Sequence, residues 1–310
     1  MLRFGGALRS LIVISALTAC TSSTSSTREQ NEVARPVVVA TSAIAADFVH
    51  RLAGDYIKLV ILVPNAVDTH TYEPKASELR ALDGAILVVL PDSDLNSEIT
   101  QIAEITVGQE NIIDLNASSL TEQDYIYRDR TARRGRNVHT WTDPSLAVKW
   151  IDPLASALVM RLPHQRERIL AAATELIAEL EKLDSETRAS INTLSESSRK
   201  LVVYHDAWEY FGRRYSVEVV GALQAVDFSE PSAAEIAAMA EQIRNEQVRA
   251  FFGSEVFPSA IMRTLEGESG SRYVSDLADD ALPGQPGTIE HTYRGMMERN
   301  VSLIVENLRP

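Results

Sequence analysis

Short aliphatic and β-branched runs alternate with amphipathic stretches along the chain from residue 35 onward. A strand followed by a helix, repeated many times, is typical of an α/β fold with parallel sheets. We predict strands at 37–41, 56–62, 85–90, 111–115, 201–204, 217–220 and 249–252. We predict helices at 44–52, 74–82, 143–162, 164–194, 207–214, 233–244 and 289–308.

The longest amphipathic stretch separates two such α/β patterns. Between His164 and Leu194 apolar residues recur at helical spacing, at Ile169, Ala172, Leu176, Leu180 and Leu183. A helix of about thirty residues would be roughly 45 Å long. The roughly 275 residues after the N-terminal segment exceed the usual size of one core.

We therefore predict two lobes, each with a mainly parallel sheet flanked by helices, joined by this one long helix. The predicted boundaries are 35–162 for the N-terminal lobe, 163–198 for the connecting helix and 199–310 for the C-terminal lobe. The polar and charged segment 119–138 shows no periodicity, and we expect a surface loop there.

The first residues have the pattern of a secretory signal. A basic start is followed by a short apolar run at 11–17 and by Leu17-Thr18-Ala19-Cys20. This end resembles a bacterial lipobox, which implies a signal peptide at 1–19 and acylation of Cys20, with a plain signal peptide as the alternative. Residues 20–34 are polar and predict a flexible tether. We expect an extracytoplasmic protein that this lipid anchors to the membrane.

The composition limits the classes of molecule that this protein would bind. The formal net charge of −13 argues against a nucleic-acid-binding protein, which needs basic patches. The same charge favours attraction of cations, although solubility explains it equally well. Cys20 is the only cysteine, so the chain has no intramolecular disulfide.

Three histidines and one aspartate are spaced almost evenly. His70, His139, His205 and Asp276 lie 69, 66 and 71 residues apart. Such residues must come from separate loops, and three imidazoles with one carboxylate form a tetrahedral set for a cation such as Zn²⁺. His70 and His205 follow predicted strands, where α/β sheets bind ligands. From the residues alone, structural histidines remain an equal alternative.

The segments around these positions resemble the metal-binding receptors of bacterial ABC importers, the zinc/manganese cluster called A-I or cluster 9. The matching stretches run over residues 68–74, 139–144, 205–211, 275–276 and 292–300. The resemblance covers 36–308. It departs at Thr69, where relatives have proline, and at Ser254-Glu255, where relatives often have Glu followed by Ser.

The resemblance implies a binding protein and not an enzyme. It would hold a metal between the lobes, with His70 and His139 from the first lobe and His205 and Asp276 from the second. It would deliver this cargo to a membrane permease driven by a cytoplasmic ATPase, and we expect a monomer. Asp279 and Asp280, within one turn of Asp276, remain alternatives for the fourth ligand.

The third ligand bears on which metal is carried. Relatives with glutamate there are associated with Mn²⁺ and those with histidine more often with Zn²⁺, so His205 favours Zn²⁺, with Mn²⁺ or Fe²⁺ as alternatives. Against zinc, the 119–138 loop has no histidine. A zinc hydrolase and a surface adhesin are the rivals, but four protein ligands leave no open position for catalysis and no HExxH or G-x-S-x-G motif is present.

Overall fold

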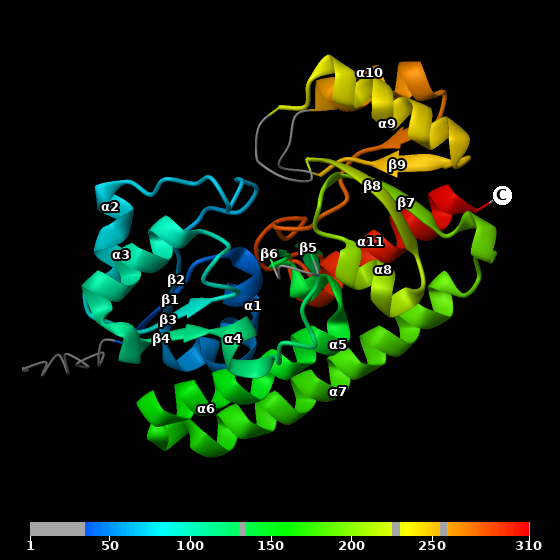
Figure 1. The fold of residues 1–310 in the computed structure, drawn as a ribbon. Coiled ribbons are helices and arrows are strands. Elements are labelled where there is room, and N and C mark those ends of the chain that lie inside the picture. The colour runs from blue at the N-terminus through cyan, green and yellow to red at the C-terminus, as the bar shows by residue number, and fades with distance from the viewer. Residues whose placement is uncertain (1–34, 130–133, 225–229, 255–258, 310) are drawn as a thin grey trace, which may run out of the picture. The chain divides into compact units, whose positions relative to one another are not determined.

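The computed structural model describes residues 35–129, 134–224, 230–254 and 259–309. The first lobe contains a four-stranded parallel sheet with the order β2-β1-β3-β4 (Figure 1). Its strands are β1 (Val37–Ala40), β2 (Lys58–Ile61), β3 (Ala85–Leu90) and β4 (Ile112–Asp114). Its helices are α1 (Ala43–Ala53), α2 (Ala76–Leu79), α3 (Ser97–Val107), α4 (Leu115–Ser119), α5 (Pro144–Ala147) and α6 (Ile151–Arg161).

The second lobe repeats this architecture with the strand order β10-β9-β7-β8, again all parallel. Its strands are β7 (Lys200–His205), β8 (Glu218–Gln224), β9 (Ala250–Phe252) and β10 (Arg272–Val274). Its helices are α8 (Glu209–Tyr215), α9 (Ala233–Asn245), α10 (Ser259–Ser269) and α11 (Tyr293–Leu308).

One long helix, α7 (Arg166–Ile191, 26 residues), runs along the base of both lobes (Figure 1). It packs against α1, α5 and α6 of the first lobe and against α11 of the second. The predicted fold class, two parallel-sheet lobes and a long helix, is confirmed. The helix is shorter than the predicted span because short 3₁₀ turns at Pro163–Gln165 and Glu196–Ser198 flank it. The lobe boundaries remain predictions.

A single apolar core joins the inner faces of both sheets to α7 and α11. Alternate strand residues face opposite sides, as the period of a strand requires. Val38 and Ala40 lie in this shared core, whereas Val39 packs on the outer face with α3. Both sheet faces are therefore covered, which explains why the strands read as continuous apolar runs.

The helices α3, α4 and α10 and the strand β10 were not predicted, and the loop predicted at 119–138 was partly wrong. The structure has a short antiparallel hairpin there, β5 (Tyr127–Asp129) and β6 (Arg134–Arg136). The hairpin strands are three residues each and rich in charge, so they carry no apolar alternation. β10 also lacks a recognisable apolar alternation, since only Val274 of its three residues is buried.

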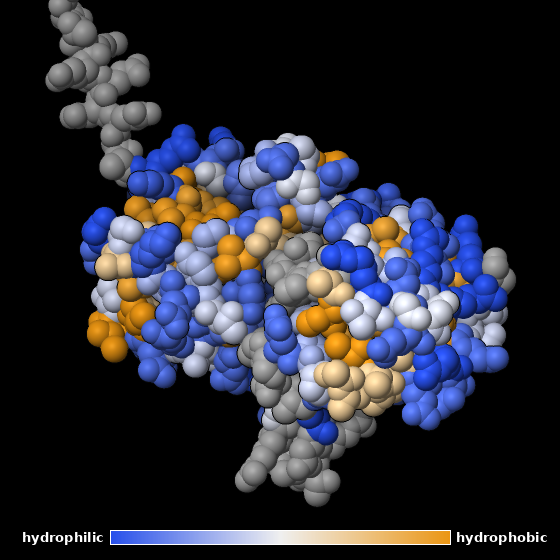
Figure 2. Space-filling model, turned by 90° about the horizontal axis from the view of Figure 1, so that it is seen from above, coloured by the Kyte–Doolittle hydropathy of each residue, from blue (hydrophilic) through white to orange (hydrophobic). Residues whose placement is uncertain are grey.

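The surface is mainly hydrophilic in the view of Figure 2, with several hydrophobic patches between the hydrophilic residues. Exposed large apolar side chains include Ile61, Ile105 and Met160. Within the described ranges, no helix combines the length and apolar character needed to cross a bilayer. The predicted signal peptide, Cys20 and the tether lie outside the described residues.

Candidate metal centre

His70 lies in the loop that follows β2. The backbone N–H of His70 donates to Asp68 Oδ1 at 2.9 Å. Asn96, which caps the start of α3, donates from Nδ2 to the carbonyls of Thr69 and Tyr72 at 2.9 and 3.0 Å. These bonds fix the backbone on both sides of His70. The loop is therefore held in place although Thr69 stands where relatives have proline.

His139 immediately precedes a 3₁₀ turn, Thr140–Thr142, that leads into α5. Asp143 caps α5 by accepting a hydrogen bond from the backbone N–H of Ser145 at 2.9 Å, and Pro144 occupies the first helical position. Proline there is favourable because that residue has no intrahelical N–H bond to lose. The expectation that Asp143-Pro144 starts a helix beside His139 is confirmed.

His205 is the last residue of β7, an interior strand of the second sheet with β8 and β9 on either side. The carboxyl ends of parallel strands share one edge of a sheet, which is where α/β folds bind ligands. The side chain is buried, with 3% exposed. Sequence reasoning placed this residue just after a strand, one position from where it lies.

The structure places Asp280, not Asp276, beside the three imidazoles. Asp276 has a left-handed backbone (φ 68°), and its side chain is 57% exposed, near Arg299. The side chain of Asp280 is 1% exposed and groups with His70, His139 and His205. The selection of Asp276 for this group was therefore wrong by four residues.

The segment around Asp280 did carry a signal. Leu277, Ala278, Ala281 and Leu282 are all buried, so the two aspartates between them are held inside, whereas Asp276 follows a polar serine. The side chain of Asp279 makes hydrogen bonds outside this group. It accepts hydrogen bonds from Ser254 Oγ at 2.9 Å and from the N–H of Asp280 at 3.0 Å. Asp280 is left to face the imidazoles.

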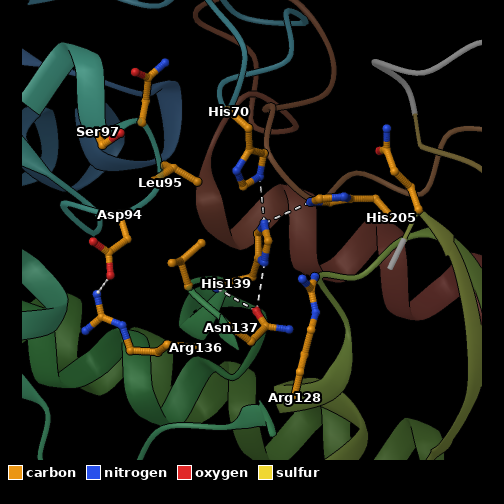
Figure 3. Close-up of a pocket in the computed structure, with 12 residues that line it drawn as sticks. His70, Asp94, Leu95, Ser97, Arg128, Arg136, Asn137, His139 and His205 are labelled. Atoms are coloured by element: carbon orange, nitrogen blue, oxygen red, sulfur yellow. Dashed lines mark hydrogen bonds and ion pairs between the residues drawn. The ribbon is translucent and has the colours of Figure 1, made fainter. Parts of the chain in front are cut away.

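The four side chains converge on one point (Figure 3 shows the histidines). His139 Nε2 lies 3.0 Å from His70 Nε2 and 2.9 Å from His205 Nε2. Asp280 Oδ2 lies 3.3 Å from His70 Nε2, and Oδ1 lies 3.7 Å from His139 Nε2. In a tetrahedral site with bonds of about 2.0–2.1 Å, donor atoms are about 3.3–3.4 Å apart. The donors are therefore near the spacing that a small divalent cation requires.

The electrostatics of the cluster also suit a cation. Burial lowers the pKa of His205 to about 4 and the pKa of His139 well below its ordinary value, with Asp280 opposing both shifts. Burial raises the pKa of Asp280, but His139 and His70 more than offset this and hold its pKa below the usual range. Both oxygens of Asp280 are buried and accept no hydrogen bond from the described residues. An anionic carboxylate beside neutral imidazoles is stabilised when a metal ion binds.

A polar cavity of about 290 Å³ adjoins the three histidines. Arg128 and Arg136 of the hairpin line it, each paired with acidic groups. Arg128 Nη2 lies 3.0 Å from Asp206, and Arg136 Nη2 lies 2.7 Å from Asp92 and 2.6 Å from Asp94. These two arginines therefore stand in ion pairs beside the cluster, and the paired carboxylates offset part of their positive charge.

Two parallel-sheet lobes, a single long helix and a buried group of three imidazoles and a carboxylate define a metal-binding receptor of the solute-binding class. Residues 38–307 match the family model described as "Zinc-uptake complex component A periplasmic", and the chain belongs to this family. Its members are substrate-binding components of ABC importers and not enzymes. The resemblance stated from the sequence motifs is confirmed.

Relatives align over nearly their whole length. The manganese-binding lipoprotein MntA of Bacillus subtilis is 26% identical over 307 residues, covering 96% of this chain and 97% of that protein. The iron ABC transporter substrate-binding lipoprotein MtsA of Streptococcus pyogenes is 24% identical and covers 97% of each chain. The structure of the periplasmic zinc-binding protein TroA from Treponema pallidum has a TM-score of 0.83 and 26% identity, over 89% of this chain and all of that one.

Proposed function

We propose that this protein captures Zn²⁺ outside the cytoplasmic membrane and delivers it to an ABC permease. The ion is cargo, held by His70, His139, His205 and Asp280. The observation that carries the proposal is the convergence of three buried imidazoles with one buried carboxylate. Four protein donors complete a tetrahedral shell and leave no position for a reactive water, as a receptor and not a hydrolase requires.

The identity of the metal is argued from the donors, because the relatives named above bind manganese, iron and zinc. Imidazole nitrogen suits Zn²⁺, whereas carboxylate oxygen suits Mn²⁺. His205 supplies a third nitrogen at a position where an oxygen donor would favour manganese. Three nitrogen donors against one carboxylate support Zn²⁺ as the cargo.

One observation supports manganese as the second candidate. Both oxygens of Asp280 face the imidazoles, with Oδ2 3.3 Å from His70 Nε2 and Oδ1 3.7 Å from His139 Nε2. A carboxylate that binds through both oxygens would raise the number of donors to five and add a hard ligand. That arrangement suits Mn²⁺, or Fe²⁺, better than a strictly tetrahedral shell does.

The route of delivery follows from the family and from the N-terminal sequence. We propose that the signal peptide at 1–19 directs export, that acylated Cys20 anchors the protein, and that residues 20–34 tether the lobes near a permease with its cytoplasmic ATPase. Two relatives named as lipoproteins, one of them as part of an ABC transporter, support this arrangement. We propose that the receptor acts as a monomer, which light scattering of the purified protein tests.

The test is metal content followed by competition titration. The chain from residue 21 onward keeps the whole compact unit of residues 35–310 and can be purified without the anchor. We expect one equivalent of zinc, and after chelator treatment we expect Zn²⁺ to bind more tightly than Mn²⁺. His205→Ala should lose tight binding, whereas His164→Ala, an exposed histidine outside the cluster, should keep it.

Two results would count against the proposal in different ways. Tight Mn²⁺ with weak Zn²⁺ would keep the receptor and change its cargo. Stoichiometric metal that survives His205→Ala would show that the ion is held elsewhere. A His205→Glu variant adds a directional check, because an added oxygen donor should shift the preference toward Mn²⁺.

A further inference from the structure

Asn137 lies two residues before His139 and is 4% exposed. Its Oδ1 accepts two hydrogen bonds from His139, one from the backbone N–H at 3.0 Å and one at 2.8 Å from ring Nδ1 (Figure 3). Because a backbone N–H can only donate, the oxygen of the amide must face His139. The orientation of this asparagine is thereby determined by its partners.

This orientation determines the state of the imidazole. An amide oxygen only accepts, so the ring nitrogen it faces, Nδ1, must carry the proton. The neutral ring then has its lone pair on Nε2, the atom that lies 3.0 and 2.9 Å from the Nε2 atoms of His70 and His205. Asn137 holds His139 in the one tautomer that can bind a metal at the cluster.

The other polar groups of Asn137 reach the second lobe. Its Nδ2 donates to the carbonyl of Asp206 at 2.9 Å, and Asp206 directly follows His205. Its own carbonyl accepts a hydrogen bond from the hydroxyl of Tyr210 at 2.6 Å. One buried side chain therefore contacts a first-lobe imidazole and the backbone next to a second-lobe imidazole.

We propose that Asn137 is a positioning residue that couples the orientation of His139 to the contact between the lobes. This inference rests on the proposed metal-receptor function and extends it. When the lobes are in contact, the bond to Asp206 immobilises the amide, and the amide holds the ring with Nε2 toward the ion. When this contact is lost, the amide loses one of its two anchors and His139 loses its fixed orientation. Lobe contact and ligand geometry then change together.

The test separates the two bonds with two variants. Asn137→Ala removes both, whereas Asn137→Asp keeps an acceptor for His139 and removes the donor to Asp206. Second-sphere partners of metal ligands typically contribute 10- to 100-fold in affinity, so we expect Asn137→Ala to weaken Zn²⁺ binding by about that factor. We expect Asn137→Asp to bind more tightly than Asn137→Ala. Asn111→Ala, which removes an asparagine whose bonds stay within the first lobe, should leave the affinity unchanged.

A spectroscopic measurement distinguishes positioning from a general loss of stability. Nitrogen NMR of histidine-labelled, metal-free protein should show His139 protonated at Nδ1 in the wild type and in Asn137→Asp, and a mixture of tautomers in Asn137→Ala. Wild-type affinity and an unchanged tautomer in Asn137→Ala would overturn the inference. If the wild type bound no metal, the proposed function would fail, but the tautomer measurement would still decide the role of Asn137.

Discussion

Asp280→Asn tests which carboxylate completes the metal site. The substitution keeps the shape of the side chain and removes its charge, at a position where the side chain is 1% exposed. Removing one partner of a buried ion pair costs about 3–5 kcal/mol. Since about 1.4 kcal/mol corresponds to a factor of ten, we expect metal affinity to fall by roughly a hundredfold to several thousandfold. Asp276→Asn is the matched control, because its side chain is 57% exposed, and it should change the affinity little.

Thermal unfolding with and without metal gives an independent readout of the same substitution. A ligand that binds only the folded state at 100 times its Kd stabilises it by about 2.7 kcal/mol. At the same zinc concentration, a variant weakened a hundredfold would gain only about 0.4 kcal/mol. The shift in Tm caused by zinc should therefore almost vanish in Asp280→Asn and persist in Asp276→Asn. The opposite pattern would refute the assignment of the fourth ligand to Asp280.

Three further predictions concern pH and packing. Since burial lowers the pKa values of His139 and His205, few protons compete with the metal for these imidazoles. In competition titrations between pH 6.5 and 5, the logarithm of the metal affinity should therefore fall by no more than about one unit per pH unit. A slope near three would contradict this. Burial raises the pKa of Asp92 from 3.8 to about 6, so between these pH values the folded state binds a proton that the unfolded state does not. The protonated carboxyl therefore contributes about 3 kcal/mol to the unfolding free energy below pH 4, and this contribution is lost as the pH rises through 6. Denaturant unfolding at several pH values should show that this pH-dependent contribution is absent in Asp92→Asn. Gly295→Ala would place a Cβ 2.2 Å from the carbonyl oxygen of Ile289, and we expect the unfolding free energy to fall by about 1–3 kcal/mol. Gly267→Ala is the control, because the added carbon there meets no neighbour.

The strand and helix pattern was predictable because each parallel strand is covered on both faces. Burial on both sides demands continuous aliphatic runs, and those runs are visible in the sequence without any knowledge of partners. The strands that were missed, β10 and the β5–β6 hairpin, are three residues long and have charged members. Their conformation depends on pairing with a distant strand or on ion pairs, neither of which leaves a periodic pattern.

The hairpin shows how tertiary contacts gave a function to an irregular segment. Arg128 and Arg136 read as loop charges, yet they pair with Asp206 and with Asp92 and Asp94 beside the cluster. Asn137 likewise shows its role only in three dimensions, because its partners are His139 and a carbonyl 69 residues away. Hydrogen bonds between segments so far apart have no signature in local sequence.

By itself, the sequence determined the α/β class and the long connecting helix, and it singled out the three histidines and the acidic region that the structure brings together. Periodicity and motif spacing are local properties, so they can be read along the chain. Only the tertiary structure decided that Asp280 and not Asp276 faces the imidazoles. The difference is four residues in one loop, and its cause is that a left-handed turn exposes Asp276 while the buried run around Asp280 directs the next carboxylates inward.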